Sequence, residues 1–189
     1  MTERYARQMV LPEVGTAGQA KLAAARVLVV GAGGLGSPVL ATLAGAGVGR
    51  LTIVDHDRVD ESNLHRQPLY RMADLGRLKA EAARDALLAA NPTIEVVVRP
   101  RRLGVGDAPE LVAGADLVLD CADSLAATYV LSDACHALGK PLVSASVLGL
   151  AGYVGAFCGG APSYRAVFPD MPATVGSCAA NGVLGSAVA

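Results

Sequence analysis

The chain of 189 residues carries a formal net charge of -1, and 52% of its residues are hydrophobic whereas 17% are charged. This length and hydrophobic content are enough for one domain with a sizeable core. A nearly neutral chain gives no reason to expect nucleic acid or an anionic membrane as a partner. The charged N-terminus lacks the apolar core of a secretory signal, and glycines or charges interrupt every long apolar stretch, so no transmembrane helix is expected. Four cysteines without a CxxC pair suit a reducing cytoplasm.

The strongest local pattern is a β-α-β unit between residues 26 and 57. An apolar, β-branched run over residues 27–30 suits a strand buried on both faces. A glycine-rich turn and an amphipathic helix follow it, and a second strand over residues 51–54 ends at Asp55. An acid at the end of the second strand, after a GxGxxG turn, is the spacing of a nucleotide-binding fingerprint.

Each residue of this fingerprint has a physical reason to be where it is. Gly31 permits a tight turn, Gly33 lets backbone N–H groups approach a phosphate, and Gly36 completes the glycine spacing. The positive end of the following helix then faces that anion. Asp55 can accept hydrogen bonds from ribose hydroxyls. The unit therefore predicts a nucleotide site rather than a glycine-rich turn without a ligand.

The remaining pattern alternates helices and strands. Further helices are expected over residues 15–24, from Lys79 to Asn91-Pro92, and over 125–138; further strands are expected over 94–98, 117–119, 142–144 and 152–157. Strands separated by helices predict an α/β, Rossmann-like, doubly wound and mostly parallel sheet with helices on both faces. We predict one domain over residues 1–189, with an N-terminal helical arm over 1–25 and a crossover loop over 159–177.

Charged residues gather where the predicted strands end. In the polar segment 56–67, Arg66 has the fork geometry that binds a phosphate, and an ion pair with a nearby acid is an equally good explanation. Lys79 opposes the dipole of the helix it begins, which favours a ligand role. Asp123, after the strand over 117–119, suits Mg²⁺, which prefers a few carboxylates together with substrate phosphates. For the basic loop over residues 99–110, solvated charge is the default expectation.

The loop over residues 159–177 leads to Cys178, which precedes an apolar stretch that predicts a helix. A cysteine at a helix start has its thiolate stabilised by the dipole, which raises its reactivity. A small buried hydrophobe is the alternative, and the local sequence favours it.

Together these motifs resemble the ThiF/MoeB/HesA group of E1-like adenylyltransferases, relatives of ubiquitin-activating enzymes. The matching motifs run in family order along the chain: RYARQ at 4–8, GAGGLG at 31–36, the Asp55 and Asp57 pair, SNLHRQ at 62–67, Lys79, DCAD at 120–123 and SCAANGVLG at 177–185.

The resemblance implies a homodimeric enzyme that binds Mg-ATP and adenylates the C-terminal Gly-Gly carboxylate of a ubiquitin-like sulfur-carrier protein, for thiamin, molybdopterin or thiolated-tRNA synthesis. Pyrophosphate would be released. The implied nucleotide contacts are Gly31, Gly33, Gly34, Gly36, Asp55, Asp57 and Asn63, with Arg66 and Lys79 on the phosphates and Asp123 on Mg²⁺. Arg7 would reach the ATP of the partner subunit. Without the resemblance, the composition of its segment favours a solvated surface charge at Arg7. Cys178 would carry a covalent intermediate in some members.

Three departures from the family pattern have consequences. Ser163 and Ala166 stand where many members have the first CxxC pair of a zinc site, so no structural zinc is expected. After DCAD, the positions usually held by Asn, Arg and Asn are Ser124, Thr128 and Ser132, which removes a cation. The chain also stops where family members continue.

Two alternatives follow from these residues. A weakened or truncated homologue would bind nucleotide and a partner as a scaffold, without catalysis. A nicotinamide-dependent oxidoreductase is compatible with the acid at Asp55 but leaves Arg66 and Lys79 without a purpose.

Overall fold

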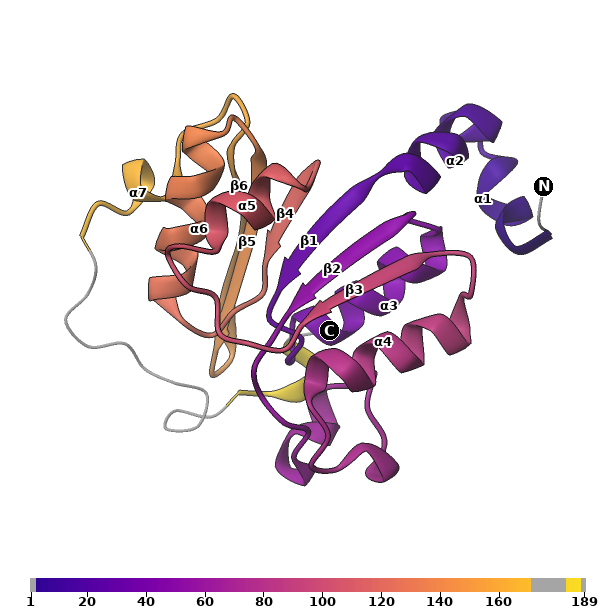
Figure 1. Ribbon diagram of the computed structural model, residues 1–189, viewed down its shortest axis with the longest axis horizontal. Coiled ribbons are helices and arrows are strands. Elements are labelled where there is room, and N and C mark those ends of the chain that lie inside the picture. The colour runs from indigo at the N-terminus through magenta and orange to yellow at the C-terminus, as the bar shows by residue number, and fades with distance from the viewer. Residues whose placement is uncertain (1–2, 171–182, 188–189) are drawn as a thin grey trace.

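The computed structural model describes residues 3–170 and 183–187, and it forms a six-stranded sheet (Figure 1). The strand order is β3-β2-β1-β4-β5-β6, in which neighbours from β3 to β5 are parallel and β6 is antiparallel to β5. The strands are β1 (Arg26–Val30), β2 (Arg50–Val54), β3 (Glu95–Arg99), β4 (Leu117–Asp120), β5 (Pro141–Leu148) and β6 (Ala151–Cys158). The predicted Rossmann-like, mostly parallel sheet is confirmed.

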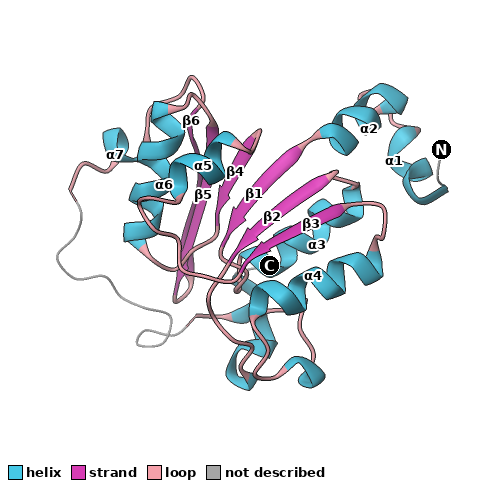
Figure 2. Cartoon of the chain, in the orientation of Figure 1, coloured by secondary structure: helices cyan, strands magenta, loops and turns pink. Residues whose placement is uncertain are grey.

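Helices cover both faces of this sheet (Figure 2). Alternate residues of β1 point to opposite faces, so Val27 and Val29 belong to one hydrophobic cluster and Leu28 and Val30 to the other. The first cluster packs against α3 (Gly36–Ala46) and α4 (Lys79–Ala90), and the second against α5 (Ala108–Ala113) and α6 (Leu125–Ala137). Between β2 and α4 lie the 3-10 helices η2 (Glu61–Arg66) and η3 (Met72–Asp74).

The N-terminal arm comprises η1 (Glu3–Tyr5), α1 (Ala6–Met9) and α2 (Gly15–Ala24), and it precedes the amino end of β1. Polar side chains of the arm form hydrogen bonds with the ends of α3 and α4. Gln8 donates to the carbonyl of Ala46 at 2.9 Å, and Arg4 donates to the carbonyl of Ala90 at 2.8 Å. The buried amide of Asn91 donates to the Tyr5 hydroxyl at 2.7 Å. The arm is therefore part of the folded domain.

Three stretches differ from the sequence predictions. The basic loop over residues 99–110 contains the start of α5, which has a proline in its first turn. β5 extends beyond residue 144 because its second half pairs with the first half of β6 around a turn with Gly149 at φ 61°. The stretch predicted as a crossover loop from residue 159 contains a short helix, α7 (Tyr164–Val167).

The apolar helix predicted from Cys178 is wrong for the residues that can be compared. Val183 instead forms a parallel bridge with Gly149, and the 3-10 helix η4 (Gly185–Ala187) follows. The amide of Leu184 donates to the carbonyl of Gly149 at 3.2 Å, so residues 183 and 184 pair with the β5–β6 turn instead of continuing an α-helix. Cys178 itself lies outside the described residues. Within residues 3–170 and 183–187, no helix is long and apolar enough to span a membrane.

Candidate functional site

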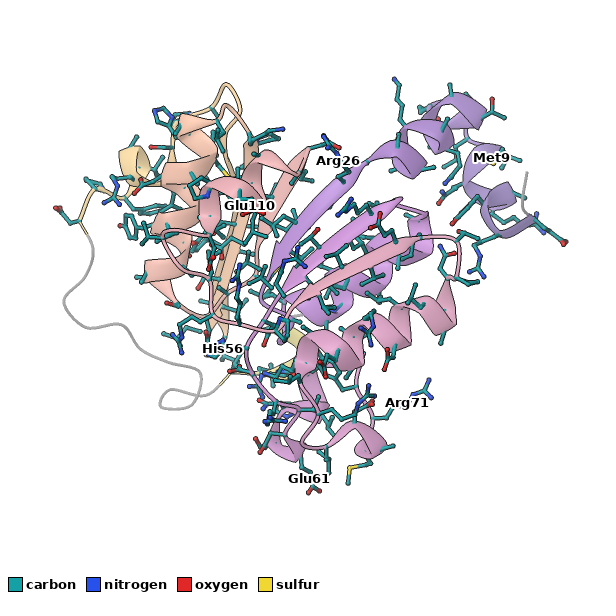
Figure 3. The ribbon with its side chains drawn as sticks, in the orientation of Figure 1. Met9, Arg26, His56, Glu61, Arg71 and Glu110 are labelled. Carbon is teal, nitrogen blue, oxygen red and sulfur yellow. The ribbon has the colours of Figure 1, made fainter. Side chains whose placement is uncertain are left out.

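A cavity of about 1060 Å³ opens at the carboxyl ends of the parallel strands. The strand order reverses between β1 and β4, and open α/β sheets bind ligands at such a switch point. The cavity walls include the glycine turn after β1, residues 55–57 after β2, part of η2, the loop after β3, the loop after β4 with the start of α6, and the end of β5. His56 and Glu61 lie on this side of the molecule, whereas Met9 of the arm lies far from them (Figure 3).

The glycine turn is tightly packed, and two of its glycines, Gly31 and Gly36, cannot be replaced without displacing backbone. Gly31 has φ +92°, and a Cβ on it would lie 2.5 Å from the carbonyl oxygen of Cys121. A Cβ on Gly36 would lie 1.9 Å from the carbonyl oxygen of Gly31. The Tyr70 hydroxyl donates to the carbonyl of Ala32 at 2.7 Å. The turn therefore presents its free N–H groups in one fixed geometry.

Asp55 follows β2 and lies against this turn. Its side chain accepts hydrogen bonds from the N–H groups of Ala32 at 2.7 Å and Asp57 at 2.8 Å. Burial raises the pKa of Asp55, and these two hydrogen bonds oppose the rise because they favour the carboxylate. Only 8% of the residue is exposed, and the part that reaches the cavity can accept hydrogen bonds from hydroxyl groups.

Two predicted phosphate-binding cations line the cavity. Lys79 begins α4, its side chain is 6% exposed, and its ammonium lies 3.1 Å from a carboxylate oxygen of Asp57. Arg66 donates to the side-chain oxygen of Asn63 and to the carbonyl of Ser62. Among the described residues Arg66 forms no ion pair, so the alternative explanation of that arginine is not supported. Asp60 instead caps η2 by accepting from Ser62.

Asp123 approaches the same cavity from the loop between β4 and α6. Its side chain is exposed, and no hydrogen bond or ion pair joins it to the part of the chain that the structure describes. A carboxylate that lines the same cavity as two cations and has no described partner fits Mg²⁺, which binds through one or two carboxylates and substrate phosphates. The metal role of Asp123 stays a prediction.

The three hydroxyl residues that follow Asp123 bring no charge to the cavity, although Ser124 and Thr128 line it. Ser124 is the N-cap residue of α6, and the buried Thr128 is joined to the carbonyl of Ser124 at 3.4 Å. The buried hydroxyl of Ser132 accepts from the backbone N–H of Tyr164 at 3.0 Å. At these positions α6 therefore contributes no cation to the cavity.

The loop after β3 contributes cations to the cavity wall. The sequence analysis had expected these residues to be solvated surface charges. Arg101 and Arg102 line the cavity, and a guanidinium nitrogen of Arg102 lies 2.9 Å from Nε2 of His56. Arg101 pairs with Asp107 at 2.9 Å. β3 is the parallel neighbour of β2, so residues after both strands emerge at one edge. The expected neighbouring positions of β2 and β3 in a parallel sheet were the signal from which this contact could have been predicted.

Among the described site predictions, Arg7 and Gly36 do not line this cavity. Arg7 lies on α1, in the arm near Met9, far from the carboxyl ends of the strands (Figures 1 and 3). It is exposed and contacts no described residue through a hydrogen bond or ion pair, although Arg4, Tyr5 and Gln8 of the same motif are all bonded. Cys178 belongs to the part of the chain that the structure does not describe.

The positions of the family's first CxxC pair lie at the start of α7. The Ser163 hydroxyl caps this helix by accepting from the N–H of Ala166 at 3.2 Å. Arg165 forms a two-pronged pair with Asp133 at 3.0 and 2.7 Å and lies 4.6 Å from the centre of the Tyr129 ring. α7 is thus attached to α6 by an ion pair and aromatic contacts.

Fold and cavity together define an α/β domain of the Rossmann-like class with a ligand-sized site at the carboxyl ends of its strands. The chain belongs to the ThiF family, whose model matches residues 5–189. The chain is 50% identical over 186 residues to mouse "Adenylyltransferase and sulfurtransferase MOCS3", covering 97% of this chain and 40% of that protein. It is 46% identical over 189 residues to "Probable adenylyltransferase/sulfurtransferase MoeZ" of Mycobacterium tuberculosis, covering 96% and 48%.

Solved structures give the same fold. The structure titled "E. coli MccB + ATP" superposes with a TM-score of 0.78 at 27% identity, covering 87% of this chain and 51% of that chain. The present chain therefore spans less than half of the curated relatives named above and about half of this structural neighbour.

Proposed function

We propose that this chain adenylates the C-terminal Gly-Gly carboxylate of a ubiquitin-like sulfur-carrier protein, using ATP and releasing pyrophosphate. The observation that carries the proposal is the convergence of Arg66, Lys79 and Asp123 on one cavity beside the glycine turn. The relatives named as adenylyltransferases and the neighbour solved with ATP support it. The family gives no support to the alternative of an oxidoreductase.

The reaction suits a site without a general base. The carrier's carboxylate is already a nucleophile, so its oxygen attacks the α-phosphorus while the bond to the pyrophosphate oxygen breaks. Catalysis then rests on positioning and on neutralising charge at the phosphates. Lys79 and Arg66 would bind phosphate oxygens, and Lys79 would exchange or share its contact with Asp57. Mg²⁺, when bound, offsets phosphate charge, and Asp123 would hold it.

The remaining contacts complete the nucleotide site. Asp55 would accept from the ribose hydroxyls, and Asn63, which already orients Arg66, would contact the nucleotide. Gly33 and Gly34 would offer their N–H groups, which donate to no described residue. Arg7 would act from a second copy in a homodimer, because it lies far from the cavity of its own chain. Adenylation itself does not need Cys178, so its covalent role is a separate proposal.

ATP–pyrophosphate exchange tests this function. A panel of carriers ending in Gly-Gly is assayed with the chain, with Asp123→Ala as the matched control for the metal ligand. Exchange that requires both a carrier and Asp123 is the expected result. Exchange without a carrier, or undiminished in Asp123→Ala, would reject the mechanism.

A second candidate is a scaffold that binds nucleotide and a carrier without catalysis. The lack of a cation at Thr128, which lines the cavity at the position of the family's arginine, favours it. ATP binding by calorimetry with no exchange for any carrier would establish this candidate. Restoring the arginine by Thr128→Arg would then be the next variant to assay.

A further inference from the structure

Asp120 has a buried carboxyl group to which the proposed function gives no role. It ends β4, directly before the loop over residues 121–124, and only 1% of the residue is exposed. No cation in the part of the chain that the structure describes is paired with it. Burying a carboxyl group without a cation is costly, and an apolar side chain of similar size would pack there with less loss of solvation. The carboxyl group therefore needs an explanation other than packing.

Neutral donors from three neighbouring segments converge on this side chain. One oxygen accepts from the N–H of Ala122 at 3.2 Å, and the other accepts from the hydroxyl of Ser144 in β5 at 2.8 Å. Burial raises the pKa of Asp120, and hydrogen bonds from Thr128, Ser144 and Ala122 oppose that rise. The carboxyl group thus attaches the end of β4 to the loop after it, to α6 and to β5, which lie close together (Figure 1).

The loop that Asp120 holds is the one that carries Asp123. Its start is fixed, because the N–H of Cys121 donates to the carbonyl of Val30 at 2.8 Å. Among the described residues, positions 122 and 123 then make one hydrogen bond, which runs from the N–H of Ala122 to Asp120. The Asp123 side chain has no described partner of its own, so its place at the cavity depends on the backbone that Asp120 holds.

We propose that Asp120 is a positioning residue: its buried carboxylate fixes the loop over residues 121–124 so that Asp123 presents its own carboxylate to a divalent cation in the cavity. This inference rests on the proposed function, which assigns the metal to Asp123. Asp120 does not line the cavity, so it acts through Asp123 rather than by touching the ligand. Thr128, which brings no cation to the cavity, takes part in this support through its hydroxyl.

A carboxylate suits this task better than an amide does. One N–H and two hydroxyl groups face Asp120, and a carboxylate offers both of its oxygens as acceptors, whereas an amide offers one. Mg²⁺ demands near-ideal octahedral geometry, so a ligand that is displaced slightly binds it less well. Loss of a group that orients a metal ligand typically weakens metal binding by about 10- to 100-fold.

The test is Asp120→Asn, which keeps the size of the side chain and one of its two acceptor oxygens. Titration calorimetry on the full chain measures the ATP dissociation constant with excess Mg²⁺ and again in EDTA. We expect the dissociation constant of Mg-ATP to rise by about 10-fold. In EDTA, the affinity of the variant for ATP should match that of wild type, because the other nucleotide contacts do not depend on this loop.

Two further variants support this measurement. Thr128→Val removes one donor and keeps the side-chain shape, so it should weaken Mg-ATP binding in the same direction as Asp120→Asn and by less. Asp116→Asn is the matched control at the opposite end of β4. The Asp116 carboxylate also accepts from a backbone N–H, that of Arg26 at 2.9 Å, and it lies outside the cavity lining. Its replacement should leave Mg-ATP affinity unchanged.

A double-mutant cycle separates positioning from a general loss of structure. In the Asp123→Ala background, Asp120→Asn should cause no further loss of Mg-ATP affinity, because the ligand that Asp120 positions is gone. Additive losses in the cycle, or equal losses with Mg²⁺ and in EDTA, would overturn the inference and leave Asp120 a structural role alone. Unchanged Mg-ATP affinity in Asp120→Asn would overturn it as well.

Failure of the proposed metal role has a different signature. If ATP affinity of the wild-type chain does not depend on Mg²⁺, or if Asp123→Ala binds Mg-ATP as wild type does, Asp123 does not hold the metal and the inference falls with it. Because the readout is binding, the test is independent of the exchange assay. A chain in which Asp120 and Asp123 are coupled in Mg-ATP binding, but which shows no exchange, would reject the adenylyltransferase and keep the inference.

Discussion

Lys79 is bonded to Asp57 twice, once through its backbone and once through its side chain. Its N–H donates to the Asp57 carbonyl at 2.9 Å, and its ammonium lies 3.1 Å from the Asp57 carboxylate. The first bond fixes the start of α4 to the segment after β2, and the second holds a nearly buried cation at the cavity wall. The partner carboxylate is 49% exposed, so the ammonium is positioned without being enclosed.

The first prediction concerns this ammonium. Lys79→Met should lower kcat/KM for pyrophosphate exchange by at least about 100-fold, as removal of one preorganised electrostatic group from an active site does. Lys140→Met is the matched control, because the Lys140 ammonium donates to the carbonyl of Ala115 at 2.7 Å and lies outside the cavity lining. Exchange assays on both variants give the answer. Retention of exchange within a few-fold in Lys79→Met would contradict the assigned role.

The second prediction compares two glycines of one helix. Gly36→Ala should destabilise the fold by more than about 2 kcal/mol and abolish ATP binding, because its Cβ would collide with the backbone of Gly31. Gly45→Ala, whose Cβ would meet nothing within 4 Å, should stabilise the fold by about 0.5–1 kcal/mol through helix propensity. Urea unfolding measures both. Equal effects at the two positions would mean that the tight turn is not what requires Gly36.

The β-α-β unit was predictable because its signals are local. Gly31, Gly36 and Asp55 are arranged by a strand, a turn and a helix that follow one another in the chain, and β1, α3 and β2 form in the predicted order. The short α5 was missed because it has six residues and begins within a loop rich in glycine and arginine. Local patterns carry little information about so short a helix.

Contacts between distant segments could not be read from the sequence. The pairing of Arg102 with His56 depends on β2 and β3 being neighbours in the sheet, and Oε1 of the buried Gln67 lacks a partner among the described residues. A motif identified Gln67 as part of SNLHRQ but gave it no role. The roles of Arg7 and Cys178 stay predictions, since one requires a second copy and the other lies outside the described residues.

The third prediction concerns the buried carboxyl of Asp120, which is 1% exposed. It accepts from the Ser144 hydroxyl at 2.8 Å and the N–H of Ala122 at 3.2 Å, and burial raises its pKa. A raised carboxyl pKa in the folded state lowers stability as pH rises above the unfolded pKa. Asp120→Asn removes this titration, so its free energy of unfolding relative to wild type should increase between about pH 4 and pH 7.

Urea unfolding at several pH values tests this expectation for Asp120. Asp133→Asn is the control with the opposite sign, because Arg165 lowers the pKa of Asp133. Its stability relative to wild type should therefore decrease over the same pH range. A constant difference between Asp120→Asn and wild type would show that the buried carboxyl does not titrate differently in the folded state.

The fourth prediction concerns how α7 is held where many family members are expected to bind zinc. Tyr164 is buried, with its ring 5.4 Å from Tyr129 and 5.2 Å from Phe157, centre to centre, in edge-on geometry. Its hydroxyl accepts from Tyr153 at 3.1 Å. Tyr164→Ala should cost about 3–5 kcal/mol because it empties a packed aromatic site, whereas Tyr164→Phe should cost about 0.5–1.5 kcal/mol for the lost hydrogen bond.

Arg165→Ala should change stability little, because both it and Asp133 are about half exposed and such pairs are screened by water. Melting in the presence of a chelator shows whether α7 is held by aromatic packing or by a bound metal ion. If Tyr164 packing holds α7, the melting temperature of the wild-type chain is the same with and without EDTA, and Tyr164→Ala is the variant that melts early. A melting temperature that falls with EDTA and recovers with added zinc would mean that donors other than Ser163 and Ala166 bind the metal, and that the aromatic contacts are secondary to it.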